Sequence, residues 1–202
     1  MRLPSSEYLN RPWRLHEVAP DFEVEDVWQL PTPGGPDDLD RLVRGFTSGD
    51  GSTVRRGVVG FLFLARRKLG TWFGWDRPES GIGGRVASVR DRLPADLAAG
   101  PRGPDSKVLP FRSVFQTHDE WVAETANGTV HGLVHIGWVR GAGDVYSAQL
   151  TVLVRPNGWT GRLYMAFITP FRYLIVYPSM LRAIGRRWAA TPQGAGPGRS
   201  SS

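Results

Sequence analysis

The most constraining feature of the sequence is a series of four strand-like segments in its second half. They are rich in β-branched and aromatic residues, as strands are, and they read FRSVFQT, DEWVAETA, TVHGLVHIGWV and VYSAQLTVLVR from Phe111 to Arg155. Asn127-Gly128 separates the second from the third, and this dipeptide is the strongest short signal for a β-hairpin. RGAGD separates the third from the fourth. The pattern predicts an antiparallel meander.

One further strand and three helices are expected around this meander. In chain order they are a strand over 22–30, a helix that begins at Asp37 or Asp38 and runs through about Phe46, a buried helix over 55–73, and a long helix from about 159 to 190 with kinks at Pro170 and Pro178. A strand, two helices, a meander of strands and a final helix indicate an α+β fold with an antiparallel sheet.

The domain organisation follows from length and local composition. The 202 residues suffice for one domain with a sizeable core, which is expected over 1–190. Residues 191–202 lack apolar content and are expected to form a disordered tail. The Gly-, Pro-, Arg- and Asp-rich region over 76–106 is expected to be a mobile lid or poorly ordered.

Composition excludes several classes of function. The absence of cysteine excludes disulfides, thiolate nucleophiles and cysteine metal sites. The net charge of +6 comes from arginines scattered among acids, without a basic run or a nucleic-acid module, so no nucleic-acid partner is expected. No signal peptide is recognisable at the N-terminus. The apolar stretch over 163–184 has the length of a membrane span but contains Arg172 and Arg182, so a helix packed inside a cytoplasmic protein is expected, with peripheral membrane contact left open.

The hairpin turn predicts which side chains share a face of the sheet. A two-residue turn at Asn127-Gly128 places Ala126 opposite Thr129, and a five-residue RGAGD loop places Val139 opposite Val145. One face then carries almost only apolar side chains and is expected to look toward the C-terminal helix. Its members are Trp121, Ala123, Thr125, Val130, Gly132, Val134, Ile136, Trp138, Tyr146, Ala148, Leu150, Val152 and Val154.

The other face carries two His–Glu pairs. The same register sets Glu124 opposite His131 and Glu120 opposite His135, with Gln149 beyond His135, so hydrogen-bonded ladders are expected. Four residues along a strand span about 13 Å, so His131 and His135 are too far apart to bind one ion, and no metal site is expected. We expect a solvated outer face whose pairs are structural. The alternatives are acid–base dyads in which the carboxylate orients the imidazole, or burial beneath the loop over 76–106.

Several long segments resemble a bacterial family, domain of unknown function 2867. They are EWVAETANGTVHGLVHIGWV over 120–139, VLVRPNGWTGRLYMAFITPFRYLIVYPSMLRAIGRRW over 152–188, PWRLHEVAPDFEVEDVWQLPTPGGPDDL over 12–39 and ARRKLGTWFGWD over 65–76. The pattern from Gly161 and Tyr164 to Arg182 and Gly185 is similar to the end helix of polyketide-cyclase-like START proteins of the SRPBCC superfamily. This resemblance implies a helix-grip fold, a curved antiparallel sheet around a long C-terminal helix, with two helices inserted after the first strand. It implies no activity and no catalytic residues.

Together, the apolar face and this resemblance lead to the expectation of a small hydrophobic ligand, lipid- or polyketide-like, in an internal cavity without a cofactor. The expected lining is Val130, Val134, Trp138, Tyr146, Leu150, Tyr164, Phe167 and Phe171. The alternative is a cyclase or dehydratase acting in the same cavity, for which Glu120, Glu124, His131 and His135 are the candidate acid–base residues. The sequence does not decide between these, and it leaves the oligomeric state open.

Overall fold

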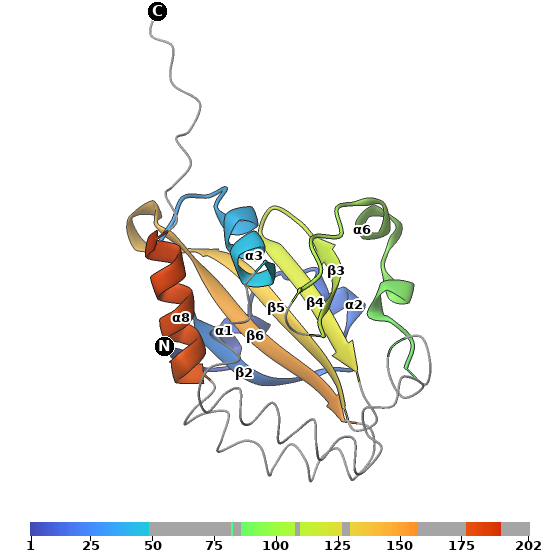
Figure 1. The fold of residues 1–202 in the computed structure, drawn as a ribbon. Coiled ribbons are helices and arrows are strands. Elements are labelled where there is room, and N and C mark those ends of the chain that lie inside the picture. Colours follow the sequence, from blue (N-terminus) through green and yellow to red (C-terminus); the bar gives the residue numbers. More distant parts are fainter. Residues whose placement is uncertain (49–81, 83–85, 108–109, 127–129, 157–176, 191–202) are drawn as a thin grey trace, which may run out of the picture.

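The protein has an α+β fold built on one antiparallel sheet (Figure 1). The structure is a computed structural model that describes residues 1–48, 82, 86–107, 110–126, 130–156 and 177–190. Within these residues the sheet has six strands in the order β1-β2-β6-β5-β4-β3. The strands are β1 (Arg2–Leu3), β2 (Glu23–Gln29), β3 (Arg112–Gln116), β4 (Glu120–Ala126), β5 (Val130–Arg140) and β6 (Tyr146–Pro156).

The predicted meander is confirmed, but its register differs from the expected one by two residues. Ala126 pairs with His131 in the β4–β5 hairpin, so four residues lie between the last paired positions where two were expected. In the β5–β6 hairpin Arg140 pairs with Tyr146, where Val139 was expected to pair with Val145. The five-residue connection therefore lies one position later in the chain, and each β5 residue pairs with a β6 residue two positions later than expected. A side chain changes face with every single residue. Because both shifts are even, every residue keeps its predicted face.

The apolar face packs against α3 (Leu39–Thr47) and α8 (Tyr177–Ala190), which lie in front of the sheet in Figure 1. This confirms that the face looks toward the C-terminal helix. The buried side chains of this core are Leu30, Leu39, Leu42, Val43, Trp121, Ala123, Val134, Ile136, Trp138, Ala148, Leu150 and Trp188. Helix α3 begins after Asp38, as expected, but the Asp38 carboxylate accepts a hydrogen bond from the Gly35 N–H (2.9 Å) rather than from a helical N–H.

Trp188 fixes the C-terminal half of α8 against the sheet. Its indole N–H donates to the Pro33 carbonyl (2.9 Å), and its ring lies 5.9 Å from the ring of Trp138. The Arg41 guanidinium lies 3.9 Å from the centre of the Trp188 ring, a cation–π contact, and also donates to the Trp188 carbonyl (3.0 Å). Arg41 therefore links α3 to α8.

The opposite face, here called the histidine face because it carries His131 and His135, is also covered. The cover consists of α1 (Ser6–Leu9), α2 (Leu15–Val18), the 3₁₀ helix η2 (Val89–Arg92) and α6 (Ala95–Ala99). These elements pack on the sheet residues through a second core, whose buried members are Tyr8, Trp13, Leu15, Val18, Ala19, Phe22, Val27, Val89, Leu97, Val114, Phe115, Val122, Leu133 and Leu153. The expected solvated outer face is therefore wrong.

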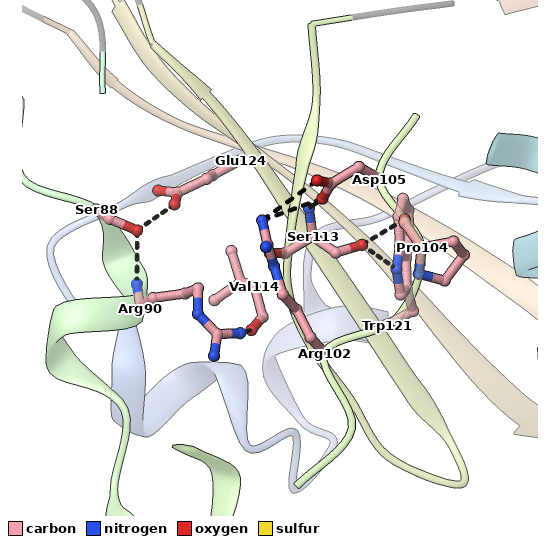
Figure 2. A network of polar contacts seen from close by, with 9 residues as sticks. All are labelled: Ser88, Arg90, Arg102, Pro104, Asp105, Ser113, Val114, Trp121 and Glu124. Carbon is pink, nitrogen blue, oxygen red and sulfur yellow. Dashed lines mark hydrogen bonds and ion pairs between the residues drawn. The ribbon is translucent and has the colours of Figure 1, made fainter. Parts of the chain in front are cut away.

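The expectation of a loose lid over 76–106 is wrong for its described part, 86–106. Val86, Val89 and Leu97 are buried there, and η2 and α6 give the segment regular structure. Figure 2 shows how it is tied to the sheet: Arg90 donates to the Val114 carbonyl and Arg102 to the Ser113 carbonyl (2.8 Å). Val89, Leu93 and Leu97 of this segment pack into the core of the histidine face.

Some expectations fall on parts of the chain outside the described residues. They are the helix over 55–73, the start of the C-terminal helix before Tyr177 and the tail over 191–202. No helix in the described part of the chain is long and apolar enough to cross a membrane.

Candidate functional site

The apolar face holds the residues expected to line a ligand cavity. Val134, Trp138 and Leu150 are buried on this face, while Val130 and Tyr146 are half-buried. Three residues of α8 that the sequence analysis did not name, Met180, Leu181 and Ile184, pack against the same core and are half-buried. Tyr164, Phe167 and Phe171 lie outside the described residues. The described residues of this face thus combine a buried core with half-buried apolar side chains; Val130 and Val152 of the sheet and Met180 and Leu181 of α8 are here called the apolar stripe.

A buried carboxylate, Asp26, also belongs to the apolar face. Asp26 pairs with Val152 across β2 and β6, and Trp28, two residues further along β2, belongs to the apolar core. The Asp26 side chain is fully buried, and Arg2 lies 3.9 Å away at the sheet edge. A bulge between Val24 and Asp26 places it there, which is why simple alternation along FEVEDVW could not reveal it.

The two His–Glu pairs form on the histidine face as predicted, but in a buried setting. His131 and His135 are 0% exposed, and Glu120 and Glu124 are 1% exposed. The register shift places each histidine diagonally across from its glutamate: His131 is opposite Ala126 and His135 is opposite Val122. Diagonal neighbours are within reach of long side chains, so both hydrogen bonds form despite the shift.

The Glu124 carboxylate accepts three hydrogen bonds. His131 Nε2 lies 3.1 Å from its Oε2, the Val89 N–H donates to the same oxygen (2.9 Å), and the Ser88 hydroxyl donates to Oε1 (Figure 2). Ser88 is the residue before η2 and also accepts from the Arg90 N–H (3.1 Å). Burial by itself would raise the pKa of Glu124, but these hydrogen bonds outweigh it and hold that pKa below its ordinary value.

The Glu120 carboxylate has the same arrangement toward the N-terminal segment. The Arg14 N–H donates to Oε1 (2.7 Å), and the Leu15 N–H (3.3 Å) and His135 Nε2 (3.2 Å) are the partners of Oε2. Burial lowers the pKa of His135, and the neighbouring Glu120 only partly opposes that effect. Burial, with a further contribution from Glu120, raises the pKa of Tyr8 on the other side of the His135 ring.

These contacts give the pairs a clear structural role. Each carboxylate holds a covering segment: Glu120 accepts from the backbone N–H groups of residues 14 and 15, and Glu124 accepts from the Ser88 hydroxyl and the Val89 N–H. The expected ladder from Glu120 through His135 to Gln149 is only half formed: Gln149 lies opposite Gly137, and neither its Oε1 nor His135 Nδ1 has a hydrogen-bond partner among the described residues. The four candidate acid–base residues are brought together in pairs, on the face opposite the apolar stripe.

The described residues contain no group of three or more His, Asp or Glu side chains placed to hold a metal ion. Each histidine uses Nε2 toward its own glutamate, and the two pairs bind different covering segments.

Comparison with known proteins identifies the family. The sequence model described as "Protein of unknown function (DUF2867)" matches residues 18–179. This chain belongs to the DUF2867 family. The match spans β2, the described strands β3 to β6 and the first turn of α8, so both the apolar face and the His–Glu pairs are parts of the family domain. Neither the curated proteins nor the solved structures yielded a match.

Replacement of either buried histidine is expected to destabilise this DUF2867 protein. His131→Gln and His135→Gln should each lower the free energy of unfolding by about 2 kcal/mol, because a buried carboxylate loses a well-placed donor. Urea denaturation measures the loss. The control is His118→Gln, whose side chain is 91% exposed and whose replacement should cost less than about 0.5 kcal/mol. Equal, small effects in all three variants would contradict the structural role.

Stability is expected to fall on acidification. The pKa of His135 in the folded protein lies below 6.5, so the unfolded chain binds a proton at this ring more readily than the folded protein does. The stability that the neutral ring contributes is complete above pH 6.5 and is lost as the pH falls through the pKa of the folded protein. Glu124, whose folded pKa lies below 4.5, adds a second loss at lower pH. Urea midpoints from about pH 8 down to about pH 4 test this. The decline just below pH 6.5 should flatten in His135→Gln, and an unchanged profile in that variant would refute the assignment.

Proposed function

We propose that this DUF2867 protein binds a small hydrophobic molecule, lipid- or polyketide-like, on the apolar face of its sheet. The observation that carries the proposal is that this face has half-buried apolar side chains on both the sheet and the helix, namely Val130 and Val152 on the sheet and Met180 and Leu181 on α8. Small-molecule sites are lined mainly by hydrophobic and aromatic side chains. The finer architecture proposed with it is the helix-grip arrangement, in which the C-terminal helix closes one side of the ligand site.

The two sheet faces support this choice over a site at the His–Glu pairs. On the histidine face, both covering segments are held down by hydrogen bonds to carboxylates, and every member of the two pairs is buried. On the apolar face, Trp188 anchors the C-terminal end of α8, while Met180 and Leu181 remain half-buried. A guest that extends the apolar core would therefore contact side chains that still have exposed apolar surface to bury.

Native mass spectrometry of the purified chain, combined with titration of cis-parinaric acid, tests the proposal. We expect a retained apolar molecule, or saturable fluorescence enhancement by the probe. Val152→Trp should weaken probe binding about tenfold or more, because the larger ring fills the stripe. The matched control is Val139→Trp, which changes a half-buried valine that packs on the opposite core and should leave binding unchanged. Absence of both a retained molecule and probe binding in the wild-type protein would refute the function.

A cyclase or dehydratase acting on a polyketide-like substrate is the second candidate, and Asp26 is the observation that favours it. Such an enzyme needs an acid–base group beside the substrate. The His–Glu pairs first considered for this role lie on the other face, whereas the buried Asp26 carboxylate lies on the apolar face.

The mass of any retained molecule distinguishes an enzyme from a binding protein. If Asp26 takes part in a dehydrating cyclisation, Asp26→Asn should retain a molecule heavier than the wild-type one by the mass of water, because the unreacted substrate accumulates. The control is Asp91→Asn, on the exposed side of η2. Identical masses in all three proteins would rule out this reaction and leave the binding function standing.

A further inference from the structure

Besides His131 Nδ1 and Arg11 Nε, five buried polar groups of the histidine face and its cover have no hydrogen-bond partner among the described residues. They are the Tyr8 hydroxyl, the Trp13 indole N–H, His135 Nδ1, Gln149 Oε1 and the Thr151 hydroxyl. None of these residues is more than 6% exposed. Buried polar side chains in native proteins nearly always have a partner, since an unpaired one costs free energy. A group of five in one region needs a physical explanation.

The five groups gather around His135. The rings of Tyr8 and Trp13 lie 5.3 and 4.9 Å from the His135 ring, both in edge-on orientation. Thr151 is the direct cross-strand neighbour of His135, and Gln149 is the cross-strand neighbour of Gly137. Gly137 allows this gathering, because a Cβ there would lie 2.6 Å from the Trp13 ring. Two polar groups thus come from the covering N-terminal segment and three from the sheet.

The five groups are uncharged and include both hydrogen-bond donors and hydrogen-bond acceptors. The Glu120 carboxylate accepts from His135 Nε2, so the proton of the neutral ring is on Nε2 and the lone pair is on Nδ1. Burial lowers the pKa of His135, which is consistent with a neutral ring. Nδ1 and Gln149 Oε1 can then accept hydrogen bonds, Trp13 can only donate, and the hydroxyls of Tyr8 and Thr151 can do either.

We propose that these five groups form a second binding site, on the opposite side of the sheet from the apolar stripe, for the carbonyl or hydroxyl oxygen of a small neutral molecule. The donors of Tyr8, Trp13 and Thr151 supply hydrogen bonds to the lone pairs of that oxygen. His135 Nδ1 and Gln149 Oε1 accept a hydroxyl proton when there is one. Glu120 positions the imidazole, because it binds Nε2 and fixes which ring nitrogen faces the site.

The chemistry of the residues selects against charged ligands. An anion would lie beside the Glu120 carboxylate, and a metal ion would meet the indole N–H of Trp13, which cannot act as a ligand. The N-terminal segment that carries Tyr8 and Trp13 is the cover of the site. It is held by the short β1–β2 pairing, by the Glu120 hydrogen bonds and by the Arg14–Asp96 ion pair (2.8 Å), so local opening of this segment admits the ligand.

Nuclear magnetic resonance on the ¹⁵N-labelled full chain tests the site with three small probes. Acetone supplies a carbonyl, 2-propanol a hydroxyl, and dimethyl sulfide a similar shape without an oxygen. We expect saturable shifts of the His135 Nδ1 and Trp13 indole resonances with acetone and 2-propanol, and none with dimethyl sulfide. Absence of a saturable shift with either oxygen probe, as when only water occupies these groups, would overturn the proposal. So would an equal response to dimethyl sulfide.

Two near-isosteric variants assign the binding to the hydroxyls. Tyr8→Phe and Thr151→Val should each weaken binding of the oxygen probes about five- to tenfold, which corresponds to one neutral hydrogen bond. The matched controls are Tyr146→Phe and Thr125→Val, half-buried residues of the apolar face, which should bind the probes as the wild type does. If both pairs of variants behave alike, the proposal fails, whether or not the apolar face binds its own ligand.

Discussion

The burial of two carboxylates on one face of a β-sheet is the constraint on which the described structure depends. An uncompensated carboxylate in a protein interior costs several kcal/mol, so Glu120 and Glu124 require partners wherever the chain places them. They obtain a histidine from the neighbouring strand and backbone N–H groups from segments far away in sequence. The two carboxylates therefore help to fix where the N-terminal segment and the segment around η2 lie.

The two faces of the sheet hold the segments that cover them by different interactions. The histidine face joins its cover through specific hydrogen bonds, which set the orientation of each covering segment. The apolar face joins α3 and α8 mainly through side-chain packing, with Trp188 and Arg41 as the polar contacts between them. Packing tolerates a change of occupant better than a set of buried hydrogen bonds does. A hydrophobic ligand is therefore proposed on the apolar face rather than on the histidine face.

The histidines show how the same residue pattern can have different chemistry in different surroundings. A His–Glu pair in water is a weak ion pair. The same pair beneath Tyr8 and Trp13 has one ring nitrogen bound to the carboxylate and the other buried without a hydrogen-bond partner among the described residues. The family match covers the strands that carry both pairs, so the environment and the pattern belong to one domain.

The sequence by itself determined the four strands of the meander, their antiparallel order and the sheet face on which their side chains lie. These properties depend on local composition and on the alternation of side chains between the two faces along a strand. A two-residue error in the predicted pairing of β4 with β5 leaves every side chain on the same face. The tertiary structure alone decided that the histidine face is buried, that Thr151 rather than Gln149 lies directly opposite His135, and that Asp26 joins the apolar face. Burial depends on which distant segments pack on a face, and the N-terminal segment lies more than a hundred residues from the strands it covers. A bulge such as the one before Asp26 reverses the alternation without a signal in the local sequence.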